Sequence, residues 1–589
     1  MGAGAMATGH GRGLAVGEWR AFLWCAAGSV AFSAWFIWRA SFRLGGHRTW
    51  VLFDDAMVSM RYARNLARGD GLVWNAGGPR VEGITNPLWT LWMAVLHLLP
   101  VDVFRQSLLV MISGAFLLVG VLAVARRLAG EIAPDRPAIA TIAMVLCATF
   151  YPLVYWSLAG TEVGLLALLT GVITLYGVRV ARRPDEWAGR DDLGLAAASV
   201  AAVATRLDAA LVVGVVVAFG VVAAGRGRRW VMSLRLGGPA AGALVVMTAA
   251  RRVYYGDWLP NTWYLKAAGT PLGLRLSTGA RQLVVVLVAQ LAVVAVVALV
   301  GLWVARDWMW WLLATVVGVQ VVYSVAAGGD AWEYLLIANR YLTVVVVPGS
   351  VLAARGLLAL VESPQRLLPR WCWALGAAAA LVAVGSPKPP IYTRELSVHD
   401  LLADLQDHRA VYLGAAAVLA AVGWACWHRV RLGATQAAVL VTAVVIVATN
   451  ARALNAWRME PAAEMKQDFA REGWALREAT TPDTTVAVWL AGADPYFSDR
   501  PGVDLLGKSD RHLARQPATN TTSFLPGHNK IDVPWSLDTY RPDLFREPIY
   551  PIYQQELRDL GYKPVTPRLW VLRSSLEKVD LRALRKTQQ

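Results

Sequence analysis

Long apolar runs alternate with short polar stretches along the first three quarters of this 589-residue chain. Each run approaches the roughly 20 apolar residues that a membrane-spanning helix needs, and we predict about eleven to thirteen spans before residue 450. The pattern is that of a polytopic α-helical membrane protein. The clearest runs are residues 21–40, 108–125, 244–250 with their flanks, 283–304 and 411–427.

The pattern changes in the last quarter of the chain. Residues 451–589 are rich in Pro, Asp, Arg and Trp and contain no run long enough to span a membrane. Strand-like runs at 485–490 and 569–572, with a helical pattern at 462–479, predict a small α/β or α+β domain. We therefore predict a membrane domain over residues 1–450 and a separate C-terminal extracytoplasmic domain.

Composition and charge support this organisation. Hydrophobic residues make up 56% and charged residues 17%, with a mean hydropathy of +0.43, which exceeds what a soluble domain carries. The formal net charge is +16, and much of the Arg lies in short loops such as 226–229, which the positive-inside rule places in the cytoplasm. The excess of basic residues is therefore explained without binding to nucleic acid. The four cysteines show no ligand spacing, which argues against a disulfide framework or a zinc site.

The first polar loop, residues 43–85, is predicted to be extracytoplasmic if the N-terminus is cytoplasmic. Residues 86–100 then form a short apolar segment. If that segment crossed the membrane, Arg126 and Arg127 would fall on the outer side, against the positive-inside rule. One of the two neighbouring segments is therefore expected to be a half-span.

An acidic pair, Asp54 and Asp55, lies in this loop just before an amphipathic pattern at residues 56–67. The pattern predicts a helix along the membrane interface. The two carboxylates can simply cap that helix and complement its dipole. Alternatively, they face a polar pocket at the external water boundary, where they can do chemistry on a lipid-bound substrate.

Further motifs follow the acidic pair. They are residues 82–89 (EGITNPLW), 159–162 (AGTE), 205–208 (TRLD), 255–262 (YGDWLPNT), 328–333 (GGDAWE), 339–341 (NRY), 493–500 (ADPYFSDR), 504–510 (DLLGKSD) and 526–530 (PGHNK). Together with the acidic pair they resemble the GT-C superfamily of polyprenyl-phosphate-dependent glycosyltransferases. The last three resemble the cap of the mycobacterial-type terminal β-(1→2) arabinofuranosyltransferases, and the resemblance covers nearly the whole chain.

The resemblance implies a GT-C fold and a place in the bacterial plasma membrane, with the active site and the C-terminal domain on the outer side. The implied reaction moves arabinofuranose from decaprenyl-phosphoryl-arabinose to the non-reducing ends of arabinan, in arabinogalactan or lipoarabinomannan. A mannosyltransferase that uses polyprenyl-phosphoryl-mannose is the nearest alternative. A transporter for lipid-linked sugars is another, although no duplicated halves are detectable in the sequence.

The resemblance makes Asp54 and Asp55 the first candidates for catalysis, with one carboxylate acting as general base on the acceptor hydroxyl. A β-linked donor and a β-linked product imply retention, which calls instead for a carboxylate nucleophile or for same-face attack guided by the leaving phosphate. The sequence leaves these routes open. Candidate partner carboxylates are Glu82, Glu162, Asp208 and Asp330. Their structural alternatives are a local pair of Asp208 with Arg206, a helix cap at Glu162 and a turn at Asp330.

A departing lipid phosphate requires cations. The candidates near the outer surface are Arg61, Arg64, Lys266 and Arg340, each of which can instead be a snorkelling side chain. In the C-terminal domain, the candidate acceptor contacts are His528, Asn529, Lys530 and Trp535, although aromatic side chains also suit a domain core. No spacing demands a cofactor, and a divalent cation held by several converging acids stays open.

Overall fold

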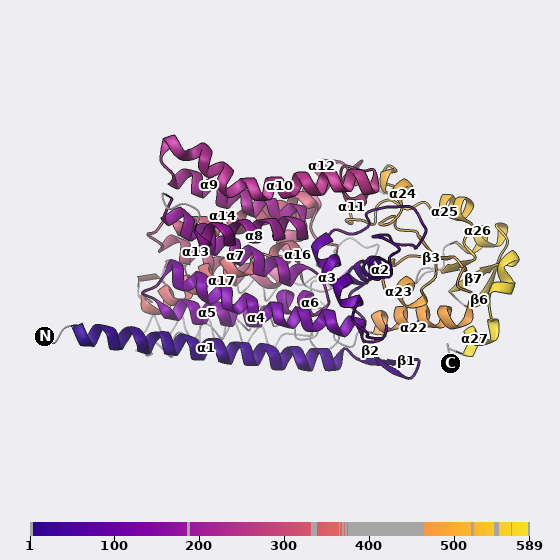
Figure 1. Cartoon of the computed structure of the whole chain (residues 1–589), viewed down its shortest axis with the longest axis horizontal. Helices are drawn as coiled ribbons and strands as arrows, with labels where there is room; N and C mark the ends of the chain where they lie inside the picture. The colour runs from indigo at the N-terminus through magenta and orange to yellow at the C-terminus, as the bar shows by residue number, and fades with distance from the viewer. Residues whose placement is uncertain are drawn as a thin grey trace.

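The protein is seen in a computed structural model that describes residues 4–184, 189–331, 338–363, 366–367, 370–371, 374, 464–519, 524–546, 553–566 and 568–586. A bundle of helices is followed by a C-terminal domain with a mixed sheet, which lies against one end of the bundle (Figure 1). This arrangement confirms the predicted fold class. The predicted boundary near residue 450 lies outside the described residues.

Five described helices are long and apolar enough to cross a membrane, and a bent pair makes up to six. The pair consists of α5 (Pro137–Thr149) and α6 (Tyr151–Leu158), which meet at 54°. The chain is thus a multi-pass membrane protein. The total of about eleven to thirteen spans stays a prediction, because the run at 411–427 lies outside the described residues. The five helices are α1 (Gly4–Arg39), α4 (Gln106–Ile132), α7 (Val163–Arg182), α10 (Arg229–Tyr255) and α14 (Met309–Ala327).

Glycine allows α13 (Ala292–Trp303) and α17 (Val346–Glu362) to approach backbone to backbone. A Cβ atom at Gly301 would lie 2.1 Å from the carbonyl oxygen of Leu352, and one at Gly356 would lie 1.9 Å from that of Val297. Because lipid supplies no hydrophobic drive between helices, such close packing is what holds membrane helices together. The other helices of the bundle are α8 (Arg190–Thr205), α9 (Ala210–Ala223) and α12 (Leu272–Val286).

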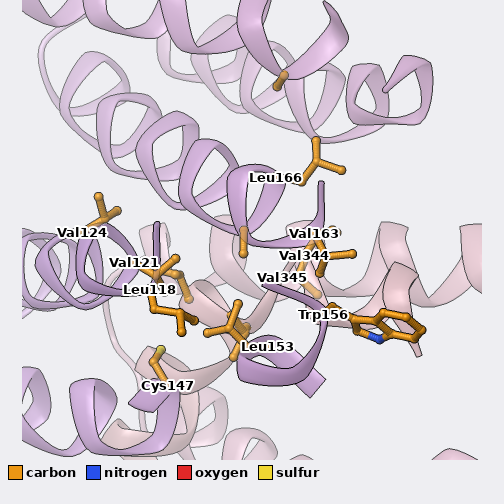
Figure 2. Close-up of a cluster of buried hydrophobic side chains, with 14 of the residues drawn as sticks. Leu118, Val121, Val124, Cys147, Leu153, Trp156, Val163, Leu166, Val344 and Val345 are labelled. Atoms are coloured by element: carbon orange, nitrogen blue, oxygen red, sulfur yellow. The ribbon is translucent and has the colours of Figure 1, made fainter. Parts of the chain in front are cut away.

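Figure 2 shows a buried cluster where α4, α5, α6 and α7 meet. Leu118 and Val121 of α4 lie beside Cys147 of α5 and Leu153 of α6, and all four side chains are buried. The Trp156 indole N–H donates to the carbonyl of Ala338 at 3.1 Å, so its polar atom is satisfied within the core. This packing fixes the ends of α6 and α7, which border the site described below.

Helix α3 (Pro87–His97) has 11 residues, so it rises about 16 Å and cannot cross a hydrocarbon core of about 30 Å. Helix α3 is therefore the half-span that we predicted from the positions of Arg126 and Arg127. The next helix, α4, brings Arg126 to 3.9 Å from Glu18, near the start of the membrane-spanning part of α1. Arg126 and Arg127 thus lie toward the N-terminal end of α1, which removes the conflict with the positive-inside rule.

Helix α2 (Asp54–Arg68) differs from the expectation of an exposed interfacial helix. Its residues 56–65 are all buried, because it lies between the bundle and the C-terminal domain (Figure 1). Phe53 occupies the N-cap and makes no capping bond with its side chain, so Asp54 and Asp55 sit in the first turn instead of capping the helix. A hairpin of β1 (Phe42–Leu44) and β2 (His47–Thr49) precedes it.

The C-terminal domain is built on a five-stranded sheet with the order β4-β3-β5-β7-β6. Strand β3 pairs in parallel with β4 and with the central strand β5, whereas β7 is antiparallel to β5 and β6. The predicted strands at 485–490 and 569–572 and the predicted helix at 462–479 are present, the first residues of the helix lying outside the described part. The elements are α22 (Glu464–Ala479), β3 (Val486–Val488), α23 (Ala493–Ser498), β4 (Gly502–Asp504), α24 (Arg511–Arg515), α25 (Val533–Tyr540), β5 (Leu544–Arg546), α26 (Gln554–Asp559), β6 (Tyr562–Thr566), β7 (Leu569–Leu572) and α27 (Leu581–Lys586).

Candidate active site

A polar cleft of about 550 Å³ lies at the first turn of α2, where the bundle meets the C-terminal domain. Its lining comes from segments that are far apart in the sequence and mixes charged with small polar side chains. Four cations and two carboxylates face it, so its wall is positive on balance. The charged members are Asp55, Glu162, Arg206, Lys266, Arg340 and Lys508.

Asp55 lies at the centre of this charge group. One carboxylate oxygen accepts from the Arg340 guanidinium at 2.8 Å, and the other forms an ion pair with the Lys508 ammonium. Burial by itself would raise the pKa of Asp55, but Lys508, Arg340 and Lys266 outweigh it and hold the pKa well below the ordinary value. Asp55 is therefore a carboxylate at neutral pH, directed into the cleft.

Asp54, the other member of the pair, faces the C-terminal domain and does not line the cleft. Its Oδ1 atom accepts from the backbone N–H of Ala493 at 3.0 Å. Its Oδ2 atom is buried and has no hydrogen-bond partner among the described residues. Burial raises the pKa of Asp54 to about 6, against the opposing effects of Lys508 and the Ala493 N–H. The two adjacent acids thus have different surroundings.

Arg340 begins the short helix α16 (Arg340–Thr343) and is held from behind by Asp330. Two guanidinium nitrogens donate to the two Asp330 oxygens at 2.7 and 2.8 Å, and the third reaches Asp55. Asp330 is almost fully buried, so it fixes the Arg340 fork more than it faces the cleft. The motifs at 328–333 and 339–341 therefore act together.

Arg206 forms a second group of the same kind. It pairs with Asp208 at 2.9 Å, which is the local interaction that the sequence suggested, and also with Glu162 at 3.0 Å. Glu162 accepts a further bond from Asn86 at 2.8 Å. Asp208 and Glu162 thus share the single positive charge of Arg206, while Asn86 connects the first loop to the start of α7.

Lys266, the last residue of α11 (Asn261–Lys266), also lines the cleft. Within the described part of the chain its ammonium has neither a hydrogen bond nor an ion pair. Burial, with repulsion from Arg340, lowers its pKa to about 8. Lys266 therefore offers the cleft a positive charge that no neighbouring carboxylate neutralises at contact distance.

Lys508 completes the cleft from the C-terminal domain, and our sequence analysis did not select it, although it lies in the quoted motif at 504–510. Its turn is held by Asn261, whose side-chain amide donates to the carbonyls of Gly507, Lys508 and Asp510 at 2.9–3.0 Å. Gly83 packs on the same turn, because a Cβ there would lie 2.9 Å from the Lys508 carbonyl oxygen. Lys is rare in this chain, and that rarity could have identified Lys508 as a candidate from the sequence.

Like Asp54, the predicted residues Glu82, Arg61 and Arg64 lie outside the cleft lining. Glu82 forms a buried ion pair with Arg251 of α10. Arg61 donates to backbone carbonyls of the C-terminal domain, including that of Arg500 at 2.8 Å, and Arg64 donates to that of Tyr496 at 2.6 Å. These arginines join α2 to the C-terminal domain, and the structure directs both away from the cleft.

The four candidates of the C-terminal domain also lie outside the cleft lining. His528 is half-buried near Lys508 and Lys266, and partial loss of solvent around the ring lowers its pKa to about 4, so the ring is neutral at pH 7. Asn529 and Lys530 hold backbone carbonyls and amides in place, Lys530 through the carbonyls of Tyr264 and Ala514 at 2.8 Å. Trp535 lies in a different cavity, described below.

No three His, Cys, Asp or Glu side chains converge as a metal site among the described residues. The acids of the cleft pair with Arg and Lys instead. The divalent cation stays an open expectation. What the arrangement can do chemically is bind a phosphate through its cations beside an ionised carboxylate, Asp55.

Comparisons with known proteins agree with the fold. Residues 456–585 match a family described as a domain of unknown function, DUF8728. No curated protein matches the chain. Two crystal structures of ArnT from Cupriavidus metallidurans are similar: the apo form has a TM-score of 0.52 at 14% identity and covers 95% of this chain and 99% of that one. The form bound to undecaprenyl phosphate has a TM-score of 0.58 at 12% identity and covers 94% and 98%.

The oligosaccharyltransferase of Archaeoglobus fulgidus, in its apo form, is more distant, with a TM-score of 0.44 at 10% identity over 83% of this chain and 64% of that one. The likeness to ArnT identifies the architecture. The chain has a GT-C fold, in which a multi-span helical domain precedes a C-terminal domain with a mixed sheet.

Proposed function

We propose that this protein is a membrane glycosyltransferase that moves a sugar from a polyprenyl-phosphate donor to an acceptor, with Asp55 at the reacting centre. The observation that carries the proposal is the Asp55 carboxylate held between Arg340 and Lys508, with Lys266 unpaired beside it. The GT-C fold supports it, as does the similarity to an ArnT structure that binds undecaprenyl phosphate.

The cations of the cleft suit the donor phosphate. The phosphate of a polyprenyl-phosphoryl sugar carries one negative charge and gains a second as the sugar leaves, so the transition state needs more positive charge than the ground state. Lys266 supplies charge that no carboxylate neutralises at contact distance. Arg340 is oriented by Asp330, and an oriented donor costs no reorganisation when the leaving group develops its charge. We assign Lys266, Arg340 and Lys508 to phosphate binding.

Asp55 is a weak base while both cations neutralise it. When the donor phosphate shares Lys508 and Arg340, Asp55 loses part of this stabilisation and its pKa rises. Binding of the donor therefore activates the carboxylate. In a same-face displacement guided by the leaving phosphate, which retains the configuration, Asp55 takes the proton from the acceptor hydroxyl as that oxygen attacks the sugar. In a double displacement its oxygen attacks first, releases the lipid phosphate and forms a glycosyl-enzyme ester that the acceptor then cleaves.

For the sugar, we propose arabinofuranose from decaprenyl-phosphoryl-arabinose, added in terminal β-(1→2) linkage to cell-wall arabinan at the outer face of the plasma membrane. The motifs at 493–500, 504–510 and 526–530 support this choice by resemblance. Two of them reach the site, since Lys508 lines the cleft and a Cβ atom at Gly527 would lie 3.4 Å from Cε of Lys266. A mannosyl donor is the second candidate, because the acidic first loop is common to both classes.

The test uses purified protein, decaprenyl-phosphoryl-arabinose and a synthetic arabinan acceptor, with the new linkage determined by NMR. We expect a β-(1→2) product that the Asp55→Asn variant does not form. Transfer from polyprenyl-phosphoryl-mannose alone would replace the proposed sugar and retain the site. An Asp55→Asn variant as active as the wild type would remove Asp55 from the chemistry.

A further inference from the structure

A second cavity, which we call the outer groove, lies on the C-terminal domain beside the active-site cleft. It has a volume of about 1050 Å³ and is open to solvent. Its walls are α24, α25 and a short stretch of the first loop around Val81. The chemistry proposed above does not use this groove.

The groove and the cleft share a wall. Lys508 lines the cleft and its neighbour Ser509 lines the groove, while Gly83 lines the cleft and Val81 lines the groove. The Tyr62 hydroxyl ties the wall together by donating to the Val81 carbonyl at 2.8 Å and contacting the Ser509 hydroxyl at 3.3 Å. Two residues of extended chain span at most about 7 Å, so the groove begins about one sugar unit from the cleft.

Aromatic rings form one side of the groove. Trp535 stacks on His512 with ring centroids 3.8 Å apart, and Tyr540 meets Trp535 edge-on at 5.4 Å. Tyr540 is 44% exposed, yet its hydroxyl is fixed by Asp510 at 2.6 Å. Such a wall presents rigid apolar area next to polar atoms, which suits a ligand with both C–H faces and hydroxyl groups.

The charges of the groove cancel, in contrast to those of the cleft. Arg511 and Arg515 pair with Asp257 at 3.0 and 2.6 Å, and Asp510 supplies a second negative charge. Asp257 lies outside the groove lining but pairs with both arginines, so with Asp510 two anions balance two cations and little charge is left for a phosphate or an acidic polymer. The ligand that fits is neutral and rich in hydroxyl groups.

We propose that the outer groove binds the neutral carbohydrate acceptor chain behind its reacting end, so that the chain's terminal sugar reaches Asp55. This inference rests on the proposed function, because it takes the cleft to be the place of sugar transfer. It predicts that a long acceptor binds better than a short one, since only the long one occupies both the cleft and the groove.

The test blocks the groove without touching the cleft. Thr539 is exposed and lines the groove, so the substitution Thr539→Trp should fill it. Asp538 is an exposed neighbour on the same helix and does not line the groove, so Asp538→Trp is the matched control. The probes are a synthetic arabinofuranosyl disaccharide and hexasaccharide. We expect Thr539→Trp to raise the KM of the hexasaccharide about tenfold or more, with kcat and the disaccharide KM unchanged and Asp538→Trp like the wild type.

Equal KM values for the two acceptors in the wild type, or an unchanged hexasaccharide KM in Thr539→Trp, would overturn the proposal. A wild type that transfers no sugar would count against the proposed function, and direct binding of the hexasaccharide by calorimetry then decides the groove. Binding that Thr539→Trp abolishes supports the groove on its own. Absence of binding to the wild type refutes it.

Discussion

The Asp54 carboxylate accepts a hydrogen bond from the backbone N–H of Ala493 at 3.0 Å, which joins the first turn of α2 to the C-terminal domain. Successive residues of a helix point about 100° apart, so Asp55 is directed elsewhere, into the cleft between Arg340 and Lys508. One acid of the pair therefore docks the domain that supplies Lys508, and the other is the carboxylate that we propose to act on the substrate.

Because Asp54 and Asp55 have different surroundings, we predict opposite results for two conservative variants. Asp55→Asn removes the charge that acts on the substrate, so transfer should fall by about 10²–10⁴-fold. Asp54→Asn keeps an oxygen for the Ala493 N–H and should retain activity within about tenfold. Initial rates at saturating donor and acceptor, with equal amounts of folded protein, decide the matter. Loss of activity in Asp54→Asn alone would reverse the assignment.

Asp54 should also limit stability in a way that depends on pH. Its pKa is raised to about 6 by burial, so the folded state holds this proton more tightly than the unfolded state does. The stabilisation from the proton is present below about pH 4 and is lost as the pH rises through 6. Asp54→Asn should therefore be more stable than the wild type at pH 7.5, by up to about 3 kcal/mol. At pH 4.5 the difference should shrink. Thermal unfolding in detergent at both pH values measures it, and equal gains at both would contradict the assignment.

The sequence was sufficient for the architecture and for the first acidic loop, because apolar run length and the acidic pair are local signals. It was insufficient for the roles of Arg61 and Arg64. Both were expected near the outer surface, where a lipid phosphate would bind, but they donate to carbonyls more than 400 residues away in the chain. No local pattern encodes such a contact.

Lys508 and Asn261 are a second case in which a contact between distant segments could not be predicted from the sequence. The sequence motifs that contain them were identified, but their relation depends on the docking of α11 against the C-terminal domain. There the Asn261 side chain donates to three carbonyls of the turn that carries Lys508. By contrast, the pair of Arg206 and Asp208 was predictable, because two residues of separation bring a guanidinium and a carboxylate together without help from the fold.

Lys508→Met should change the pH profile of the reaction. Lys508 is the strongest of the cations that lower the pKa of Asp55, so its removal raises that pKa. The acidic limb of the kcat/KM profile should therefore move to higher pH. Lys563→Met, which removes an exposed Lys from β6 of the same domain, is the control and should leave the limb in place. An unshifted limb in Lys508→Met would show that Asp55 does not control the rate.

Lys266 should make donor binding sensitive to alkaline pH. Burial and the nearby Arg340 lower its pKa to about 8, so the positive charge that we propose for the donor phosphate is lost as the pH rises through 8. The donor KM of the wild type should increase between pH 7 and 9, whereas Lys266→Arg should hold it constant because a guanidinium stays protonated. Lys266→Met should bind donor weakly at both pH values, by about tenfold or more, the worth of one charged hydrogen bond. Donor titrations at the two pH values separate these cases. If Lys266→Met bound donor as the wild type does at pH 7, the phosphate would have to rest on Arg340 and Lys508 alone, and the Asp55 carboxylate would then compete with it for both cations.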